Sequence, residues 1–199
     1  MFNSWDKRYS TEEYVYGTEP NEFFKEEIEK IKPGKVLFLG EGEGRNAVFA
    51  ASKGWQVDAV DASSGGKEKA LKFAAINNVE INYTVADFNN YLFSPDTYDA
   101  VVAIYLHLPE ELRVRVHTSA VKALKPGGNL ILEAFEKEQI KNNSGGPRNE
   151  DLLYSLEDIY SDFHELEISK FSKELIHLSE GKLHDGAASV IRYTGTKLK

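Results

Sequence analysis

Short apolar runs alternate with longer amphipathic stretches through the central part of the chain. Five runs have the length of strands and are rich in β-branched residues; they cover residues 35–40, 56–61, 81–86, 98–105 and 129–135. The first and fourth are apolar at nearly every position, which is typical of a sheet covered on both faces. Amphipathic stretches predict helices between the strands, at 45–53, 66–77 and 109–124. This alternation predicts βαβ units.

The two ends of the chain follow other patterns. Residues 5–20 are rich in aromatic side chains and precede a predicted helix near 21–31. A polar loop at 142–151 is followed by a predicted helix and two strand-like stretches, at 155–163, 165–173 and 188–197. The two late strands predict an antiparallel hairpin on the edge of the sheet.

Together these elements predict an α/β fold. We expect a Rossmann-like, doubly wound, mainly parallel seven-stranded sheet with a C-terminal antiparallel hairpin. A length of 199 residues fits a single domain, 1–199, in which residues 1–20 are a candidate N-terminal lid.

Composition narrows the class of protein. Lys and Arg number 24 against 32 Asp and Glu, so the formal net charge is −8, which argues against a nucleic-acid partner. The absence of cysteine excludes disulfides, thiolate zinc sites and a Cys nucleophile, and no pair among the five histidines has metal-site spacing. The longest apolar run, 100–106, is far shorter than the roughly 20 residues of a membrane span. We expect a cytoplasmic monomer with no metal and no membrane partner.

A glycine-rich loop follows the first predicted strand and opens the next helix. Gly40, Gly42 and Gly44 allow a tight turn and let a ligand approach the backbone. Asp61 ends the next strand, where a carboxylate can accept hydrogen bonds from two ribose hydroxyls. The pattern indicates a ligand that contains a nucleoside.

The charge of the loop favours one nucleoside over another. Gly42, Gly44 and Ala47 also satisfy the dinucleotide pattern, so a nicotinamide-dependent oxidoreductase remains an alternative. Glu41 and Glu43, however, would repel a doubly negative pyrophosphate. S-adenosyl-L-methionine carries a sulfonium and an ammonium group instead, and therefore fits the loop better.

An ordered set of motifs extends this interpretation over nearly the whole chain. The motifs are WDKRY, YVYGTEPNEFF, LGEGEGRNA, VDAS, ADF, YDAVVAIYLHLP, LKPGGNLILEAF, GGP and GKLHDG. In them the chain resembles the class I S-adenosylmethionine-dependent methyltransferases, and most of all the small bacterial enzymes related to the tellurite-resistance methyltransferase. The resemblance implies methyl transfer to a small molecule, such as a chalcogen oxyanion or a thiol. It also implies a set of cofactor-binding residues: Gly40, Glu41, Gly42, Gly44, Asp61, Ala62, Asp87, Phe88 and Tyr105.

One position departs from the family. Phe38 stands two residues before the first glycine, where the family usually has an acidic residue. Either Glu41 replaces that carboxylate or the cofactor binds weakly. A non-catalytic S-adenosylmethionine-binding protein is therefore a further alternative.

The catalytic residues are not determined by the sequence. Candidates are His107, Tyr105 and Tyr14, and the candidate substrate-binding residues are Tyr16, Arg45, Arg148 and His184. His107 has a structural alternative as a partly buried loop cap, and the cofactor candidate Asp87 has one as a turn cap at Asn89 and Asn90. The remaining histidines are expected on the surface, at His117, His164 and His177.

Overall fold

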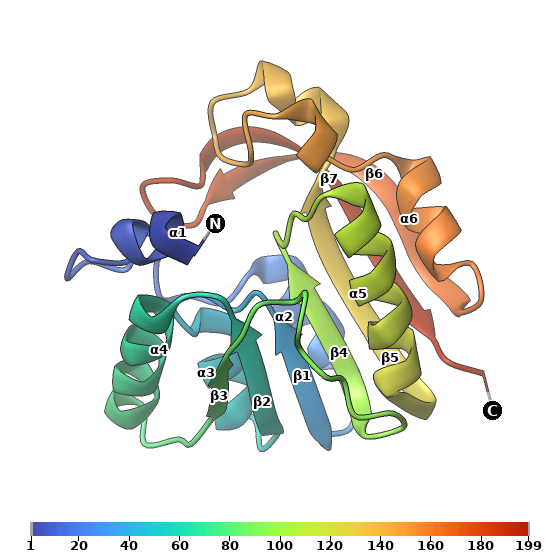
Figure 1. Ribbon diagram of the computed structural model, residues 1–199, viewed down its shortest axis with the longest axis horizontal. Coiled ribbons are helices and arrows are strands. Elements are labelled where there is room, and N and C mark those ends of the chain that lie inside the picture. Colours follow the sequence, from blue (N-terminus) through green and yellow to red (C-terminus); the bar gives the residue numbers. More distant parts are fainter. Residues whose placement is uncertain (1, 199) are drawn as a thin grey trace.

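A computed structural model describes residues 2–198, with side chains from Trp5 onward, and contains a single seven-stranded sheet (Figure 1). The strands are β1 (Lys35–Leu39), β2 (Gln56–Asp61), β3 (Asn82–Val85), β4 (Tyr98–Ile104), β5 (Leu124–Phe135), β6 (Glu167–Ser179) and β7 (Asp185–Thr196). The helices are α1 (Phe2–Arg8), α2 (Glu22–Ile28), α3 (Arg45–Ser52), α4 (Ser64–Ile76), α5 (Glu110–Ala123) and α6 (Leu156–Phe163). Two short 3-10 helices cover Lys137–Lys141 and Glu150–Leu152.

The strand order is β3-β2-β1-β4-β5-β7-β6. Strands β1 to β5 run parallel, whereas β7 lies antiparallel between β5 and β6. The predicted α/β fold, with its mainly parallel sheet and antiparallel hairpin, is confirmed. The order reverses beside β1, so the loops after β1 and β4 diverge there and leave a crevice for a ligand.

Alternation along the central strands builds a core on each face of the sheet. In β1, Leu37 and Leu39 join the cluster that α5 and α6 cover, while Val36 and Phe38 join the cluster under α2, α3 and α4. All four side chains are nearly fully buried. Phe38 packs edge-on against Phe24 of α2, with ring centroids 5.4 Å apart. The aromatic residue that departs from the family pattern is therefore part of the core.

Several predicted boundaries are wrong at the C-terminal half. Strand β5 begins at Leu124, where the Lys-Pro-Gly-Gly sequence predicts only the end of a helix. Leu124 pairs with Tyr98, and the register then shifts before Ala100 pairs with Asn129, so the proline and glycines lie in a bulge. The hairpin is also longer than predicted, because β6 is an exposed edge strand that lacks a continuous apolar pattern.

His117 is buried, not on the surface as predicted. It faces α6 from α5, and its Nδ1 lies 2.7 Å from Oδ2 of Asp162. Arg113 donates to the same oxygen through Nε at 2.8 Å. Burial lowers the pKa of His117, so the neutral imidazole is favoured in this contact.

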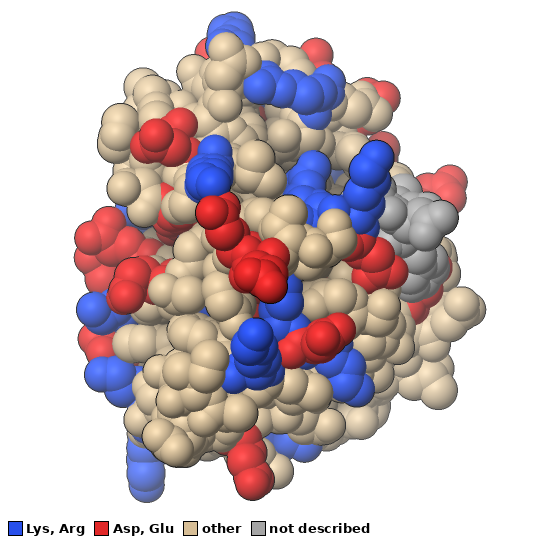
Figure 2. Space-filling model, turned by 90° about the vertical axis from the view of Figure 1, so that its left-hand side faces the viewer, with Lys and Arg blue, Asp and Glu red and all other residues tan. Residues whose placement is uncertain are grey.

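One face of the molecule carries mixed charge. Figure 2 shows Lys and Arg interspersed with Asp and Glu on the face at the left of Figure 1. Within residues 2–198, none of the helices is long and apolar enough to cross a membrane.

Candidate functional site

A cavity of about 850 Å³ lies at the carboxyl ends of the parallel strands. Its walls come from the loop after β1, the ends of β2 and β4, the loop after β3, the N-terminal segment and the β6–β7 turn. Predicted residues that line it are Gly40, Glu41, Gly42, Asp61, Ala62, Asp87, Phe88, Tyr105, His107, Tyr16, Arg45 and His184. Tyr14, Gly44 and Arg148 do not line it.

Backbone geometry explains the glycines of the loop. Gly40, Gly42 and Gly44 have φ angles of 70°, 62° and 92°, a region that side chains disfavour. A Cβ on Gly42 would lie 2.6 Å from the phenol oxygen of Tyr9, so the loop and the N-terminal segment meet there. Gly44 instead serves packing, because a Cβ there would lie 2.7 Å from Cβ of Ala70 in α4.

Asp61 has a structural task as well as a position in the cavity. Its Oδ2 accepts from the backbone N–H of Gly42 at 3.0 Å, and its Oδ1 accepts from that of Ser63 at 2.8 Å. Burial raises the pKa of Asp61, and these backbone donors oppose that shift. The carboxylate therefore holds the glycine loop in place while each oxygen keeps a second lone pair for a ligand.

The two glutamates of the loop take different partners. Glu41 Oε1 accepts from the backbone N–H groups of Asn46 and Ala47, at 3.0 and 2.8 Å, and so caps the N-terminus of α3. Burial raises the pKa of Glu41 to about 8, with the hydrogen bond from Ala47 the largest opposing effect. Glu43 points the other way, where Lys69 Nζ lies 2.5 Å from one oxygen and the Val15 backbone donates to the other at 2.9 Å.

Asp87 caps a turn with one of its two carboxyl oxygens. Its Oδ1 accepts from the backbone and the side chain of Asn89, at 2.8 and 2.9 Å, which caps the turn after β3. Asp87 still lines the cavity beside Phe88, whose ring is 8% exposed. The cap therefore fixes this carboxyl group at the cavity wall.

None of the three catalytic candidates is arranged as a general base. The phenol of Tyr105 donates to Glu133 at 2.5 Å, and burial holds its pKa well above the usual value. His107 Nδ1 lies 2.7 Å from the Leu152 carbonyl, and its Nε2 accepts from the Phe135 backbone at 3.2 Å. Tyr14 donates to the Lys69 carbonyl, outside the cavity. Both nitrogens of His107 thus have a partner in the protein.

Aromatic rings form one part of the cavity wall. The His184 ring lies 4.5 Å from that of Tyr16 and 4.7 Å from that of Tyr105, measured between centroids, and Phe135 stacks on Tyr105 at 4.5 Å. Arg8 donates to the phenol oxygen of Tyr16 at 2.7 Å. The wall thus joins the N-terminal segment to the β6–β7 turn.

The predicted arginines differ in their availability. Arg45 is 7% exposed and pairs with Oε2 of Glu180 at 2.9 Å, so its charge is compensated. Arg148 donates to the Asn142 carbonyl and to the Asn143 side chain, on the exposed side of its loop. Neither arginine presents an uncompensated charge to the cavity.

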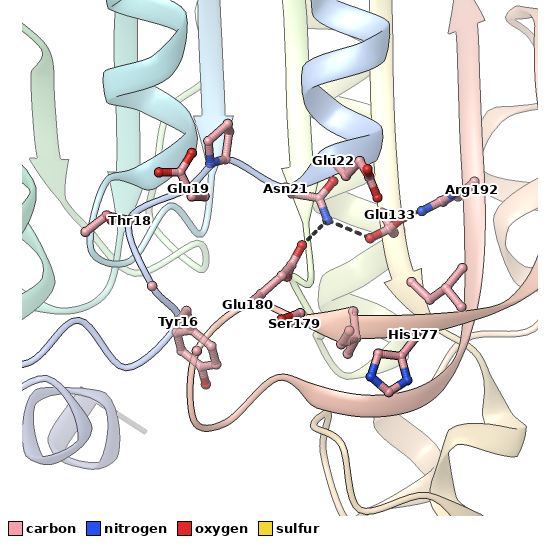
Figure 3. A pocket seen from close by; sticks show the side chains of 15 residues that line it. Tyr16, Thr18, Glu19, Asn21, Glu22, Glu133, His177, Ser179, Glu180 and Arg192 are labelled. Carbon is pink, nitrogen blue, oxygen red and sulfur yellow. Dashed lines mark hydrogen bonds and ion pairs between the residues drawn. The ribbon is translucent and has the colours of Figure 1, made fainter.

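A polar cluster behind this wall was not predicted from the sequence. Asn21 donates to Glu133 and Glu180 at 2.7 and 2.9 Å, as Figure 3 shows beside a second cavity of about 630 Å³. Glu133 is fully buried and also accepts from Nε of Arg192 at 2.6 Å. Asn21 and Glu133 are 112 residues apart in the chain, so no local pattern reveals the contact.

Comparisons with known proteins agree with this geometry. Residues 36–128 match the family model of a methyltransferase domain. Over 117 residues the chain is 28% identical to the 2-heptyl-1-hydroxyquinolin-4(1H)-one methyltransferase of Mycobacteroides abscessus, covering 57% of this chain and 52% of that protein. The chain therefore spans about half the length of this curated relative.

Solved structures share the fold over nearly the whole chain. TehB from Haemophilus influenzae is similar with a TM-score of 0.74 at 17% identity, covering 98% of this chain and 66% of TehB. A protein solved in work on the conversion of a disulfide bond into a thioacetal group during echinomycin biosynthesis gives a TM-score of 0.81 at 15% identity, covering 100% and 92%. At such identities the likeness concerns the fold alone.

The buried His107 predicts a loss of stability in acid. Burial lowers its folded-state pKa to about 4, against 6.5 for a free imidazole, so the unfolded chain takes up a proton first as the pH falls. The free energy of unfolding should drop by about 3 kcal/mol from this residue as the pH falls through that interval. Urea denaturation across the interval should show a shallower drop for His107→Gln. An equal drop in the wild-type protein and in His107→Gln would contradict this prediction. His164→Gln is the control, because His164 is exposed at the end of α6, and it should show the same drop as the wild-type protein.

Proposed function

We propose that this chain, a class I S-adenosylmethionine-dependent methyltransferase by its domain and fold, transfers a methyl group from S-adenosyl-L-methionine to a small-molecule acceptor. The observation that carries the proposal is the occupied N-terminus of α3. A dinucleotide would place its pyrophosphate on the free N–H groups of such a helix. Glu41 already accepts from two of them, at Asn46 and Ala47. The nicotinamide alternative is therefore disfavoured by the geometry of the helix N-terminus.

The residues around the cavity fit S-adenosyl-L-methionine. The open backbone at Gly40 and Gly42 suits the methionine part, and the free lone pairs of Asp61 suit the ribose hydroxyls. Asp87, Phe88 and Ala62 lie where the adenine would bind, with Asp87 Oδ2 accepting no hydrogen bond from any described residue. Gly44 supports the loop from outside the cavity.

The protein's part in the reaction is to position the reactants and exclude water. The bound cofactor supplies an electrophilic methyl group. Glu133 fixes the Tyr105 phenol, and the rings of Tyr16 and His184 narrow the acceptor side of the cavity. An acceptor held against this wall gains effective concentration, which supplies much of the rate for a displacement that needs no covalent enzyme intermediate.

The acceptor side favours a small ligand with modest charge. Arg45 is neutralised by Glu180, and Arg148 lies outside the cavity. Two other arginines, Arg8 and Arg115, line the cavity and donate to the uncharged side chains of Tyr16 and Asn89. The relative from Mycobacteroides abscessus is named for a quinolone acceptor, which supports a small organic molecule. A thiol or chalcogen oxyanion acceptor, a monomeric state and the absence of a nucleic-acid partner remain predictions.

Incubation with methyl-tritiated S-adenosyl-L-methionine tests the function. We expect label in an organic-soluble or volatile product with at least one member of a panel of thiols, hydroxylated aromatics and chalcogen oxyanions. Boiled protein is the control. Tight cofactor binding without label transfer across the panel would favour the non-catalytic alternative.

Replacement of Asp61 by Asn tests the ribose assignment. The amide keeps an oxygen for one backbone N–H but places an N–H₂ group where an acceptor is needed. We expect the affinity for S-adenosylhomocysteine to fall by about 1 to 3 kcal/mol in calorimetry. Circular dichroism checks that the variant is folded. Unchanged affinity in a folded variant would rule out the assignment.

The N-terminal segment should act as a lid. It lines the cavity through Trp5, Arg8, Tyr9 and Tyr16. Both polar contacts, such as Asp6 to Ser63 at 2.6 Å, and aromatic packing, such as Tyr14 on Phe73, hold it against α4 and the glycine loop. Because these contacts lie outside the sheet, we expect the segment to open without unfolding the core. Amide exchange in residues 5–20 should slow when S-adenosylhomocysteine is added, whereas exchange in the β4 core should not change. Equally slow exchange with and without ligand would mean that the segment is a fixed part of the fold.

A further inference from the structure

Glu41 has one carboxyl oxygen that its structural task does not use. Both backbone hydrogen bonds of the α3 cap go to Oε1. Among the described residues no group donates a hydrogen bond to Oε2, and this oxygen is not completely shielded from solvent. Glu41 itself is 9% exposed and lines the cavity. Glu41 therefore has one oxygen fixed by the helix and one that accepts no hydrogen bond from the described residues.

Among the described residues no cation forms an ion pair with Glu41. The charge of Arg45, on α3, lowers the pKa of Glu41, but the ion pair of Arg45 is with Glu180. Asp61, at the end of β2, adds a second negative charge. Tyr83, on β3, is a neutral phenol that donates to the Gly42 carbonyl at 2.7 Å. Glu43 is paired with Lys69 on the other side of the loop. Glu41 is thus a buried carboxyl group without a cation of its own, a situation that favours its protonated form.

We propose that Glu41 receives the ammonium group of the cofactor through Oε2, and that binding of the cofactor therefore drives a proton from Glu41 into solvent. The inference rests on the proposed function. The ammonium group supplies the cation that Glu41 lacks in the free protein. Glu41 is then an ionised carboxylate, and its Oε1 still caps α3. This assigns to the loop the negative charge that Phe38, buried in the core, does not supply.

The raised pKa of Glu41, about 8 without ligand, agrees with this coupling. Below that pH the free protein holds the proton, and the bound protein gives it up. Cofactor affinity should therefore rise as the pH approaches 8, until the ammonium group of the ligand begins to lose its own proton. S-adenosylhomocysteine keeps the ammonium group and should behave in the same way, whereas 5′-methylthioadenosine has the nucleoside and sulfur but no ammonium group.

Calorimetry in two buffers of different ionisation enthalpy, phosphate and Tris, counts the protons. At about pH 7 the wild-type protein should release about one proton per S-adenosylhomocysteine bound. Binding of 5′-methylthioadenosine should release none. Glu41→Gln keeps an oxygen for the α3 cap but cannot ionise, so it should bind S-adenosylhomocysteine about tenfold or more weakly and release no proton. Glu43→Gln, in the same loop, should still release the proton.

Three results would overturn the proposal. Proton release that persists in Glu41→Gln would place the titrating group elsewhere. Equal release with 5′-methylthioadenosine would point to the nucleoside side, where Asp61 lies. Binding of S-adenosylhomocysteine to the wild-type protein without proton release would also contradict it, while leaving the proposed function intact. Absence of any binding would instead overturn the proposed function, and this inference with it.

Discussion

The cap that Glu41 places on the first turn of α3 is the interaction on which the rest of the site depends. Two backbone N–H groups at the start of a helix need acceptors, and here one buried carboxyl oxygen satisfies both. Glycine at positions 40, 42 and 44 lets the chain turn back so that this residue can reach its own helix. The same contact removes the donors that a pyrophosphate would use and leaves the second carboxyl oxygen without a donor among the described residues.

The cavity is closed by segments from opposite ends of the chain. The N-terminal segment is tied to the loop through Glu43 and to α4 through Asp6, while the β6–β7 turn reaches Arg45 through Glu180. Figure 3 shows Asn21 between these regions, donating to Glu133 on β5 and to Glu180. The side chains of Asn21 and Glu133 are buried, so this polar cluster fixes the region between the two segments.

Sequence reasoning succeeded where the signal is local. The apolar runs identified each parallel strand, and the glycine loop with Asp61 located the carboxyl ends at which the cavity lies. Contacts between residues that are far apart in the sequence were not predicted. The ion pair of Arg192 with Glu133, and the contact of His117 with Asp162, each depend on how two elements pack. The start of β5 at Leu124 was not predicted, because the proline and glycines that follow it are typical of the end of a helix. In the structure these residues lie in a bulge of β5, between the pairs Leu124–Tyr98 and Asn129–Ala100.

The central claim is that the cavity beside the glycine loop binds a sulfonium cofactor rather than a dinucleotide. Competition calorimetry on the wild-type protein addresses it most directly, with S-adenosyl-L-methionine titrated alone, after S-adenosylhomocysteine and after NADH. The structure predicts one saturable site that S-adenosylhomocysteine blocks and NADH leaves open. Binding of NADH that displaces S-adenosyl-L-methionine, or no binding of S-adenosyl-L-methionine at all, would contradict the account.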